Sequence, residues 1–381
     1  MPNPSPIGHS IAANPGELAV CLLRLSALGD VSHLLPLVHA LRTQRPELRL
    51  SWITGAGEAQ LLAGIDGVEL LPYRKQDGVA GMRRLWAQLR GQRFDALLLM
   101  QLALRANLLS LGVRARRRIG YDRARSRDGH FLFVNERIPA HGYSHVLETL
   151  CQFGLPLGVR VDELHWDFAI PDAAHAFAAQ QLADGAPWLG ISACSSHALR
   201  SWHARGYAEL ARHAHRRHGL RVVLLGGRSE AERRMADQIL ALAPDARCLD
   251  LVGKDTLKQM LALLQRLTVL ASPDAGPMHL ASALGVPVLG LHAATDPRRS
   301  GPYRSLQWCV NRFPEVVRER LHIELDAVPW STRIEYPGVM DRIDIDEVLA
   351  ALDRLLATPV AERLAPARLR APPPPQGFRS R

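Results

Sequence analysis

Disulfide and metal-binding patterns are missing from this sequence of 381 residues. Its five cysteines are scattered, odd in number and never spaced as C-x-x-C, which argues against a disulfide framework or a structural zinc site. Free thiols of this kind suit a reducing cytosol, so we expect a cytoplasmic protein. No apolar run reaches the ~18–20 residues that a membrane-spanning helix needs. The opening MPNPSPIGHSIAANPGE lacks the basic and apolar regions of a secretory signal.

Aromatic residues are also scarce, at 6% of the chain. The net charge is +10, arginine far outnumbers lysine, and basic residues are densest at 83–93 and 113–127. Aromatic residues do not alternate with these groups as base-stacking platforms would, so we expect no nucleic-acid partner. We interpret the groups as solvated faces. The charge favours an anionic membrane surface or a phosphorylated substrate as a partner.

The chain does contain a regular alternation of apolar, strand-like runs with helical patterns. Its length fits two domains, and an apolar fraction of 47% favours a globular protein. The alternation predicts βαβ units and parallel sheets, and it pauses at 155–171, which we interpret as the crossing between domains. The predicted strands are 19–25, 48–54, 68–72, 95–100, 187–193, 221–226, 247–252, 267–271 and 287–291; the predicted helices are 31–44, 57–64, 79–91, 103–112, 144–154, 204–218, 229–242, 256–265, 276–284 and 343–357.

The first candidate site residue is Asp30, in the stretch LSALGDVSHLLP. Two open α/β sheets joined by a short linker form a cleft at the carboxyl ends of their strands, where ligands bind in such sheets. Asp30 follows the first predicted strand and is therefore expected at the edge of this cleft. Two interpretations stay open: an acid that caps the next helix, or a catalytic carboxylate.

A second constellation is SPDAGPMH at 272–279, which also joins a predicted strand to a predicted helix. Gly276 permits close approach of the backbone, and Pro277 suits the first helical turn. The free N–H groups of such a helix start bind anions, so the segment predicts a phosphate site. His279 lies about one turn inside, where it is either a ligand of the same anion or a half-buried structural histidine.

Two further segments follow predicted strands of the second domain. SACSSHALRSW contains Ser192, Ser195 and Arg200, and an arginine there could neutralise a phosphate through its fork of donors, although a surface arginine is the simpler interpretation. GGRSEAE contains Gly227, which makes the turn, and Glu230. Glu230 could accept hydrogen bonds from ribose hydroxyls, or merely favour the start of its helix.

Together, RLSALGDVSHLLP, the segment ending in RSW, LLGGRSEAE and SPDAGPMHLASALGVPVLGLHAATDPRRSGPY resemble glycosyltransferase family 9, the ADP-heptose:lipopolysaccharide heptosyltransferases and their relatives. The resemblance implies an α/β protein of GT-B fold: two Rossmann-like doubly wound domains facing a cleft, with a C-terminal helix that crosses back to the N-terminal domain. The expected parts are a flexible N-terminus at 1–17, an acceptor-side domain at 18–170, a nucleotide-sugar domain at 171–340, the crossing helix at 341–357 and a disordered tail at 358–381.

The resemblance also implies roles for single residues. Asp30 matches the general base for the acceptor hydroxyl, and Arg200 a cation that faces the donor phosphates. The expected donor-binding residues are Ser192, Ser195, Gly227, Glu230, Asp274, Ala275, Gly276 and His279; the expected acceptor-binding residues are Ser26 and His33. Relatives commonly have Thr or Ser where Ala275 stands, so the phosphate is expected to depend more on backbone N–H groups. The family needs no metal, and we interpret the D-x-D at 344–346 as a helix cap.

The function implied by the resemblance is inverting transfer of a heptose, or a related sugar, from an ADP-sugar to a lipopolysaccharide core or lipid A acceptor at the inner membrane surface. No cofactor is expected. We expect a monomer, attracted peripherally to that anionic surface by its basic charge. Two alternatives stay open: a nucleotide-sugar epimerase or hydrolase on the same scaffold, and a non-catalytic binding protein that keeps the fold.

Overall fold

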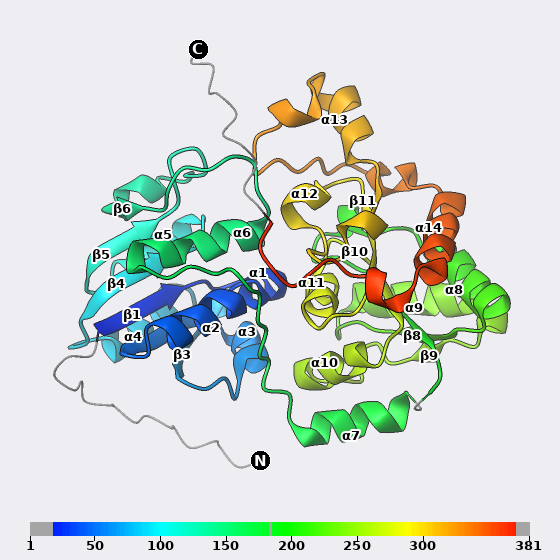
Figure 1. The fold of residues 1–381 in the computed structure, drawn as a ribbon, viewed down its shortest axis with the longest axis horizontal. Helices are drawn as coiled ribbons and strands as arrows, with labels where there is room; N and C mark the ends of the chain where they lie inside the picture. The colour runs from blue at the N-terminus through cyan, green and yellow to red at the C-terminus, as the bar shows by residue number, and fades with distance from the viewer. Residues whose placement is uncertain (1–17, 183–184, 371–381) are drawn as a thin grey trace.

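The chain folds into two α/β halves that lie side by side (Figure 1). The structure is a computed structural model, and it describes residues 18–182 and 185–370. Each half contains one six-stranded sheet whose strand pairs are all parallel, as the alternation of strands and helices predicts. The flexible N-terminus predicted at 1–17 lies outside the described residues.

The first half contains the first sheet and the helices that cover it. Its strands are β1 (Leu18–Leu23), β2 (Leu48–Gly55), β3 (Val68–Tyr73), β4 (Phe94–Leu99), β5 (Ala115–Gly120) and β6 (Glu136–Arg137); its helices are α1 (Leu28–Ser32), α2 (Leu35–Gln44), α3 (Ala56–Leu62), α4 (Gly78–Gln88), α5 (Leu104–Ser110) and α6 (Val146–Cys151). The strand order is β3-β2-β1-β4-β5-β6, so β1 and β4 are central. Their continuous apolar runs follow from burial on both faces, as in other doubly wound sheets.

The second half repeats this arrangement. Its strands are β7 (Trp188–Ile191), β8 (Arg221–Leu224), β9 (Leu249–Asp250), β10 (Val269–Pro273), β11 (Val288–His292) and β12 (Val310–Asn311); its helices are α7 (Asp172–Gln181), α8 (Ala204–His218), α9 (Glu230–Leu242), α10 (Leu257–Gln265), α11 (Gly276–Ala283), α12 (Pro297–Ser300), α13 (Phe313–Leu321) and α14 (Ile345–Ala357). The strand order is β12-β11-β10-β7-β8-β9. As in the first sheet, the chain begins at a central strand, β7, runs outward to β9, and then returns to β10 on the other side of β7 and runs outward to β12. Such points, where the chain returns to the middle of the sheet and changes direction, are where ligands bind in open α/β sheets.

The two halves meet where α1 contacts α11, and two glycines make this contact close. A Cβ atom on Gly29 would lie 2.2 Å from Cδ2 of His279, and one on Gly276 would lie 3.2 Å from Cβ of Leu28. Only residues without a side chain allow the two backbones to approach so closely. The apolar core is continuous across this contact. The carboxyl ends of the two sheets are thereby held against each other.

The structure corrects the prediction for the last helix. Val348, Leu352 and Leu355 of α14 are buried in the core of the second half, where α14 packs on α8, β11 and β12. The expectation that this helix crosses back to the N-terminal domain is therefore wrong. Its amphipathic pattern correctly predicts a buried face, but the second half supplies the surface that covers it. None of the helices between residues 18 and 370 combines the length and the hydropathy that crossing a bilayer requires.

The segment after α14 returns to the crossing between the halves. The Leu164 N–H donates to Ala367 O at 2.8 Å, and the Leu369 N–H donates to Asp162 O at 3.2 Å. Ala367 and Leu369 also pack against the apolar core. The prediction of a disordered tail is thus wrong for residues 358–370, because main-chain pairing and apolar burial hold them. Residues 371–381 lie outside the described part of the chain.

Candidate active site between the two halves

Asp30 lies in the first turn of α1, at the carboxyl edge of the first sheet. Its Oδ2 forms an ion pair with Arg24 and accepts the N–H of Ala27 at 3.4 Å. Its Oδ1 has no hydrogen-bond partner among the described residues. One oxygen of Asp30 therefore supports the start of the helix, which fits the capping interpretation, and the other oxygen remains unpartnered in the described chain. The role of Asp30 as a catalytic carboxylate stays a prediction.

The surroundings of Asp30 keep it ionised. Burial alone would raise the pKa of Asp30, but the positive charges of Arg24, Arg299 and His279 outweigh burial and hold this pKa below its usual value. Arg24 is itself buried and is fixed by a hydrogen bond to the main-chain oxygen of Met100. A carboxylate in this state is ready to act as a base at neutral pH.

Asp274 and His279 form the facing part of the site on the second half. Oδ1 of Asp274 lies 3.4 Å from Nε2 of His279, and its Oδ2 accepts from the Ser300 hydroxyl at 3.0 Å. Burial would raise the pKa of Asp274, but the hydrogen bond and charge of His279 hold it well below its usual value. Since the His279 ring also packs against Gly29, the structure brings the loop of Asp30 and the segment 272–279 together.

The start of α11 is available to an anion. Ala275 is the residue before the helix, its backbone is extended, and no side chain of the described chain caps the first turn. Gly276 begins the helix and faces α1. Ser195 donates its hydroxyl to the main-chain oxygen of Asp274 at 2.8 Å, whereas the Ser192 N–H donates to Ala271 O inside the sheet. Ser195 thus orders the loop beside the helix start, and Ser192 is buried behind it.

Other predicted donor residues have partners of their own. Arg200 pairs with Glu335, its Nε and Nη2 each 2.6 Å from the same carboxylate oxygen. Glu230 is exposed and pairs with Arg234 one helical turn along α9. The acid that does reach Gly227 is Glu232, whose Oε1 accepts the Gly227 N–H at 2.6 Å.

Glu232 was missed by the sequence reasoning, although a signal was present. Ser229 and Glu232 form a capping box at the start of α9, in which each side chain accepts from the backbone of the other residue. The S-x-x-E spacing in GGRSEAE is the known pattern for this motif. Glu232 therefore shapes the turn that contains Gly227.

The two predicted acceptor-binding residues lie in different surroundings. The Ser26 hydroxyl accepts from Nε2 of Gln101 at 3.3 Å, at the rim on the side of the first half. His33 is buried, and its ring packs edge-on against His279 and His145, with ring centroids 4.7 and 5.3 Å apart. Burial lowers the pKa of His33 well below its usual value, so this ring is a neutral part of the wall between the halves.

Arg299 is a site residue that the sequence reasoning did not assign. It lies in α12 next to Ser300, which bonds to Asp274. Its guanidinium stacks over the ring of Trp330 at 4.5 Å, and its buried Nε has no partner among the described residues. The charges of Asp30 and Asp274 both act on it. The RRS segment after T-D-P shows that cations are present, but only the fold places Arg299 where both carboxylates act on it.

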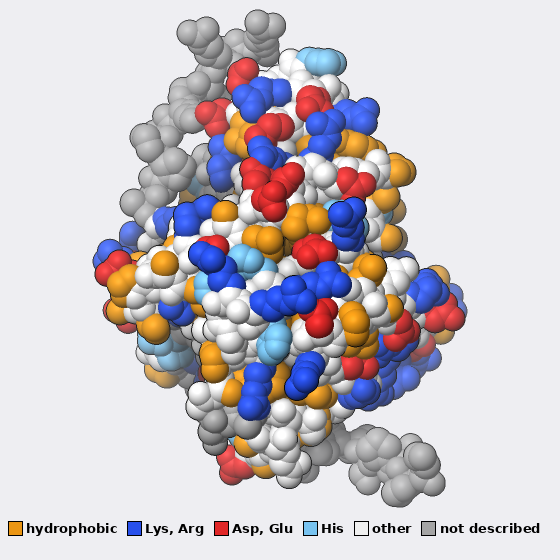
Figure 2. All heavy atoms as spheres, turned by 90° about the vertical axis from the view of Figure 1, so that its right-hand side faces the viewer, with side chains coloured by type: hydrophobic (Ala, Val, Ile, Leu, Met, Phe, Trp, Pro, Cys, Tyr) orange, Lys and Arg blue, Asp and Glu red, His pale blue; other side chains and the backbone are white. Residues whose placement is uncertain are grey.

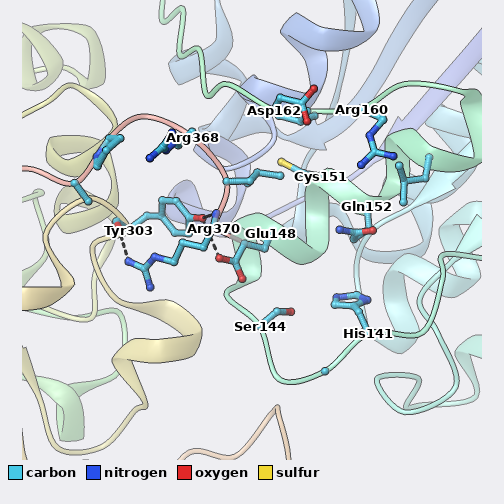
Figure 3. Close-up of a pocket in the computed structure, with 16 residues that line it drawn as sticks. His141, Ser144, Glu148, Cys151, Gln152, Arg160, Asp162, Tyr303, Arg368 and Arg370 are labelled. Atoms are coloured by element: carbon cyan, nitrogen blue, oxygen red, sulfur yellow. Dashed lines mark hydrogen bonds between the residues drawn. The ribbon is translucent and has the colours of Figure 1, made fainter. Parts of the chain in front are cut away.

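A large cavity of about 850 Å³ lies beside this site (Figure 3). It is bounded by α6, the crossing between the halves and the segment after α14, and Glu148, Tyr303 and Arg370 line it. The Tyr303 hydroxyl donates to Glu148 at 2.9 Å and accepts from the Arg370 N–H at 2.9 Å. Neither Asp30 nor Asp274 lines the cavity. It is therefore distinct from the pair of carboxylates.

A cluster of side chains of the types that bind metal ions lies elsewhere, on α8 and α14. Nε2 of His213 and of His218 are each 2.6 Å from the same oxygen of Asp353, and Arg217 lies 3.3 Å from its other oxygen. Three donors thus satisfy this carboxylate by hydrogen bonds and charge. The D-x-D at 344–346 is a helix cap, as predicted, because Asp344 accepts the N–H of residue 346 at 2.8 Å.

Comparison with known proteins identifies the family. The model of glycosyltransferase family 9 (heptosyltransferase) matches residues 82–322. The lipopolysaccharide core heptosyltransferase OpsX of Haemophilus influenzae is 37% identical over 337 residues, which cover 88% of this chain and 96% of that protein. Lipopolysaccharide heptosyltransferase 1 of Pseudomonas aeruginosa is 26% identical and covers 90% of this chain and 99% of that protein.

Solved structures of the same kind share the fold. A family 9 glycosyltransferase from Veillonella parvula superposes with a TM-score of 0.70 at 18% identity, covering 90% of this chain and 99% of that one. The Escherichia coli heptosyltransferase WaaC, solved with ADP, superposes with a TM-score of 0.66 at 18% identity, covering 88% and 99%. The predicted architecture of two Rossmann-like halves is confirmed. The chain belongs to glycosyltransferase family 9, and it is a glycosyltransferase.

Proposed function

We propose that this protein transfers a heptose from an ADP-sugar, with inversion, to a lipopolysaccharide core acceptor at the cytoplasmic surface of the inner membrane. The observation that carries the proposal is that Asp30, whose Oδ1 has no partner among the described residues, lies in the helix that packs against the uncapped start of α11. The names of the relatives support the substrates, since OpsX is a lipopolysaccharide core heptosyltransferase and WaaC has been solved with ADP-2-deoxy-2-fluoro heptose.

Asp30 is the proposed base on the acceptor side. As the acceptor oxygen attacks the anomeric carbon, Oδ1 takes the hydroxyl proton, and the bond from the anomeric carbon to the diphosphate oxygen breaks. Attack from the side opposite the leaving ADP inverts the configuration at that carbon. A positioned base of this kind contributes roughly 10²–10⁴ in rate.

The second half is proposed to stabilise the leaving diphosphate. No side chain of the described residues caps the N–H groups at the start of α11, and the helix dipole favours an anion there. Arg299 and Arg200 add positive charge. Arg200 is bonded to Glu335, so in this proposal its guanidinium group contacts both Glu335 and the phosphate. Donors held in place before the reaction are often the largest contribution to catalysis. In this mechanism no step is assigned to a metal.

A panel of donors tests the proposed function. The purified protein would be incubated with ADP-heptose, ADP-glucose, UDP-glucose or GDP-mannose and a truncated lipopolysaccharide acceptor, and the products would be analysed by mass spectrometry and NMR. We expect transfer from ADP-heptose only, with inverted anomeric configuration and no loss of rate in EDTA. Consumption of ADP-heptose without any acceptor would instead favour the epimerase or hydrolase alternative.

Replacing Arg299 by alanine is expected to lower kcat/KM roughly 10- to 100-fold, because hydrogen bonds to charged groups contribute about 1.5–3 kcal/mol. The effect should appear in the binding of ADP alone, measured by calorimetry, if Arg299 contacts the diphosphate. Arg320→Ala is a matched control, since Arg320 also stacks on an aromatic ring, that of Tyr336 at 4.0 Å. Equal losses in the two variants would contradict the role of Arg299.

The pH dependence of kcat/KM provides a separate prediction about Asp30. Because Arg24 lowers the pKa of Asp30, the acidic limb of the profile is expected below the usual range of a carboxyl group. Arg24→Met removes that charge, so the pKa of Asp30 should rise and the limb should move to higher pH. The control is Arg45→Met, which removes an ion pair with Glu47. If the acidic limb of the kcat/KM profile lay at the same pH in Arg24→Met as in the wild type, a group other than Asp30 would be responsible for it.

A further inference from the structure

Exposed apolar residues gather on one surface of the first half. Half of the large hydrophobic side chains that are exposed in the described chain belong to two short segments, and we call these five residues the α5 patch: Leu104, Leu108, Leu111, Phe131 and Leu132. Each is between 39% and 73% exposed. Exposed large apolar side chains that are concentrated in this way indicate a site of interaction with a protein or a membrane.

The helix α5 is apolar on both of its faces. Leu104, Leu108 and Leu111 recur at the spacing that places side chains on one face of a helix, and this face is open to solvent. Ala106 and Leu109 point the other way and are buried in the first half. A helix that only had to cover the sheet would need the inner face alone.

The second segment of the α5 patch is tied to α5 by hydrogen bonds. Nδ1 of His130 lies 3.0 Å from Oδ1 of Asn107, and Nδ2 of Asn107 donates to Asp128 O at 3.2 Å. Nε2 of His130 accepts the Tyr121 N–H, so Nδ1 carries the proton and donates to Asn107. Burial lowers the pKa of His130 to about 4, which keeps the ring neutral and this link intact near neutral pH. Phe131 and Leu132 follow directly, so they are held beside α5.

Positive charge is concentrated in the part of the chain that contains the α5 patch. Residues 101–137 contain nine arginines but only three carboxylates. Six of these arginines are exposed and form no ion pair with any residue of the described chain: Arg105, Arg114, Arg116, Arg123, Arg127 and Arg137. The outer face of the second half differs, because acidic and basic side chains are mixed across it (Figure 2). Residues 101–137 thus combine exposed apolar side chains with arginines that lack ion pairs in the described chain, which suits a partner that is both apolar and anionic.

The α5 patch begins next to the acceptor side of the candidate site. Gln101, three residues before Leu104, accepts the Leu25 N–H at 2.7 Å and donates to the Ser26 hydroxyl at 3.3 Å. These two residues belong to the loop that leads into Asp30. An acceptor whose lipid end lies against the α5 patch would have its sugar end near the base.

We propose that the α5 patch docks the protein on an anionic lipid bilayer, with its apolar side chains at the boundary between headgroups and acyl chains and the exposed arginines of residues 101–137 on the lipid phosphates. The inference rests on the proposed function, which places the acceptor in a bilayer. Shallow insertion of apolar side chains, combined with attraction of arginines to anionic lipids, is the way in which interfacial segments bind membranes.

Vesicle flotation with the full-length protein tests the docking. Wild-type protein is expected to float with vesicles of phosphatidylglycerol and phosphatidylethanolamine, and far less with vesicles of phosphatidylcholine. Phe131→Ser/Leu132→Ser and, independently, Leu104→Ser should each weaken partitioning at least 10-fold, and Arg105→Glu should do so at low salt. Leu242→Ser/Leu321→Ser is the matched control, since these leucines of the second half are 44% and 40% exposed. Circular dichroism would verify that each variant is folded.

Two outcomes would overturn the proposal. One is equal flotation of the patch variants and wild type. The other is a wild-type dimer in analytical ultracentrifugation that Phe131→Ser/Leu132→Ser dissociates, because the α5 patch would then be an interface between copies of the chain.

Transfer assays separate the docking from the proposed function. The patch variants should keep the wild-type kcat/KM toward a water-soluble acceptor without acyl chains, and lose at least 10-fold toward the acceptor in vesicles. Wild-type protein that transferred heptose to neither acceptor would refute the proposed function, and flotation would still decide whether the α5 patch binds lipid.

Discussion

Replacement of Asp30 by asparagine is expected to reduce kcat roughly 10²–10⁴-fold, with a much smaller change in the affinity for the donor. The amide keeps the size of the side chain but has no oxygen basic enough to take the acceptor proton, and the pair with Arg24 loses its negative charge. Initial rates with saturating ADP-heptose, combined with calorimetric binding of ADP, would separate the two effects.

Asp346→Asn is the matched control for this substitution. Asp346 is also an acid in the first turn of a helix, α14, but it is exposed and lies far from the facing carboxylates in the fold. Its replacement should change activity less than twofold, because loss of a first-turn acid affects only the helix start. An Asp30→Asn enzyme that retained full kcat would exclude Asp30 as the base.

Replacement of Gly29 by alanine is expected to lower both activity and stability. The new Cβ would lie 2.2 Å from the ring of His279, far inside van der Waals contact, and the ring can only move away from Gly29 by disturbing its contact with Asp274. Overpacking of this kind costs about 1–3 kcal/mol, and a displacement of about 1 Å at a catalytic site can reduce the rate ~10²-fold. Thermal unfolding and initial rates would measure the two effects.

Gly57→Ala tests whether the loss is specific to the contact between α1 and α11. Gly57 lies in α3, and a Cβ atom there would meet no heavy atom of the described chain within 4 Å. Alanine is also the better helix former, so this variant should be as stable as the wild type or slightly more stable. A Gly29→Ala enzyme with normal rate and normal unfolding temperature would show that the close approach of the halves is not required.

The position of Asp30 could be predicted from the sequence because it depends on topology alone. An acid directly after the first strand of a parallel sheet lies at the carboxyl edge whatever the packing around it. Its partner was not predicted. The sequence shows only that Arg24 interrupts an apolar run. The ion pair of Arg24 with Asp30 depends on how the loop between the two residues turns back. The same applies to Arg299, which reaches the site only because α12 packs beside Asp274.

Strand β5 was missed for a related reason. Its sequence, ARRRIG, has the composition of an exposed segment, and we interpreted this region as a solvated face. In the structure Arg118 donates to the main-chain oxygens of Ser110, Val113 and Phe133, and Arg117 forms a bidentate pair with Glu136. Long arginine stems pack on the sheet while their guanidinium groups find tertiary partners, and a sequence pattern does not show these partners.

The central claim is that Asp30 and the start of α11 act on opposite sides of one anomeric carbon. A crystal structure of the protein with ADP-2-deoxy-2-fluoro heptose and a truncated acceptor tests it most directly. The account predicts the diphosphate on the N–H groups of α11, with the anomeric carbon between it and Oδ1 of Asp30. A donor bound instead in the cavity beside Glu148 and Tyr303, with its anomeric carbon out of reach of Asp30, would contradict the claim.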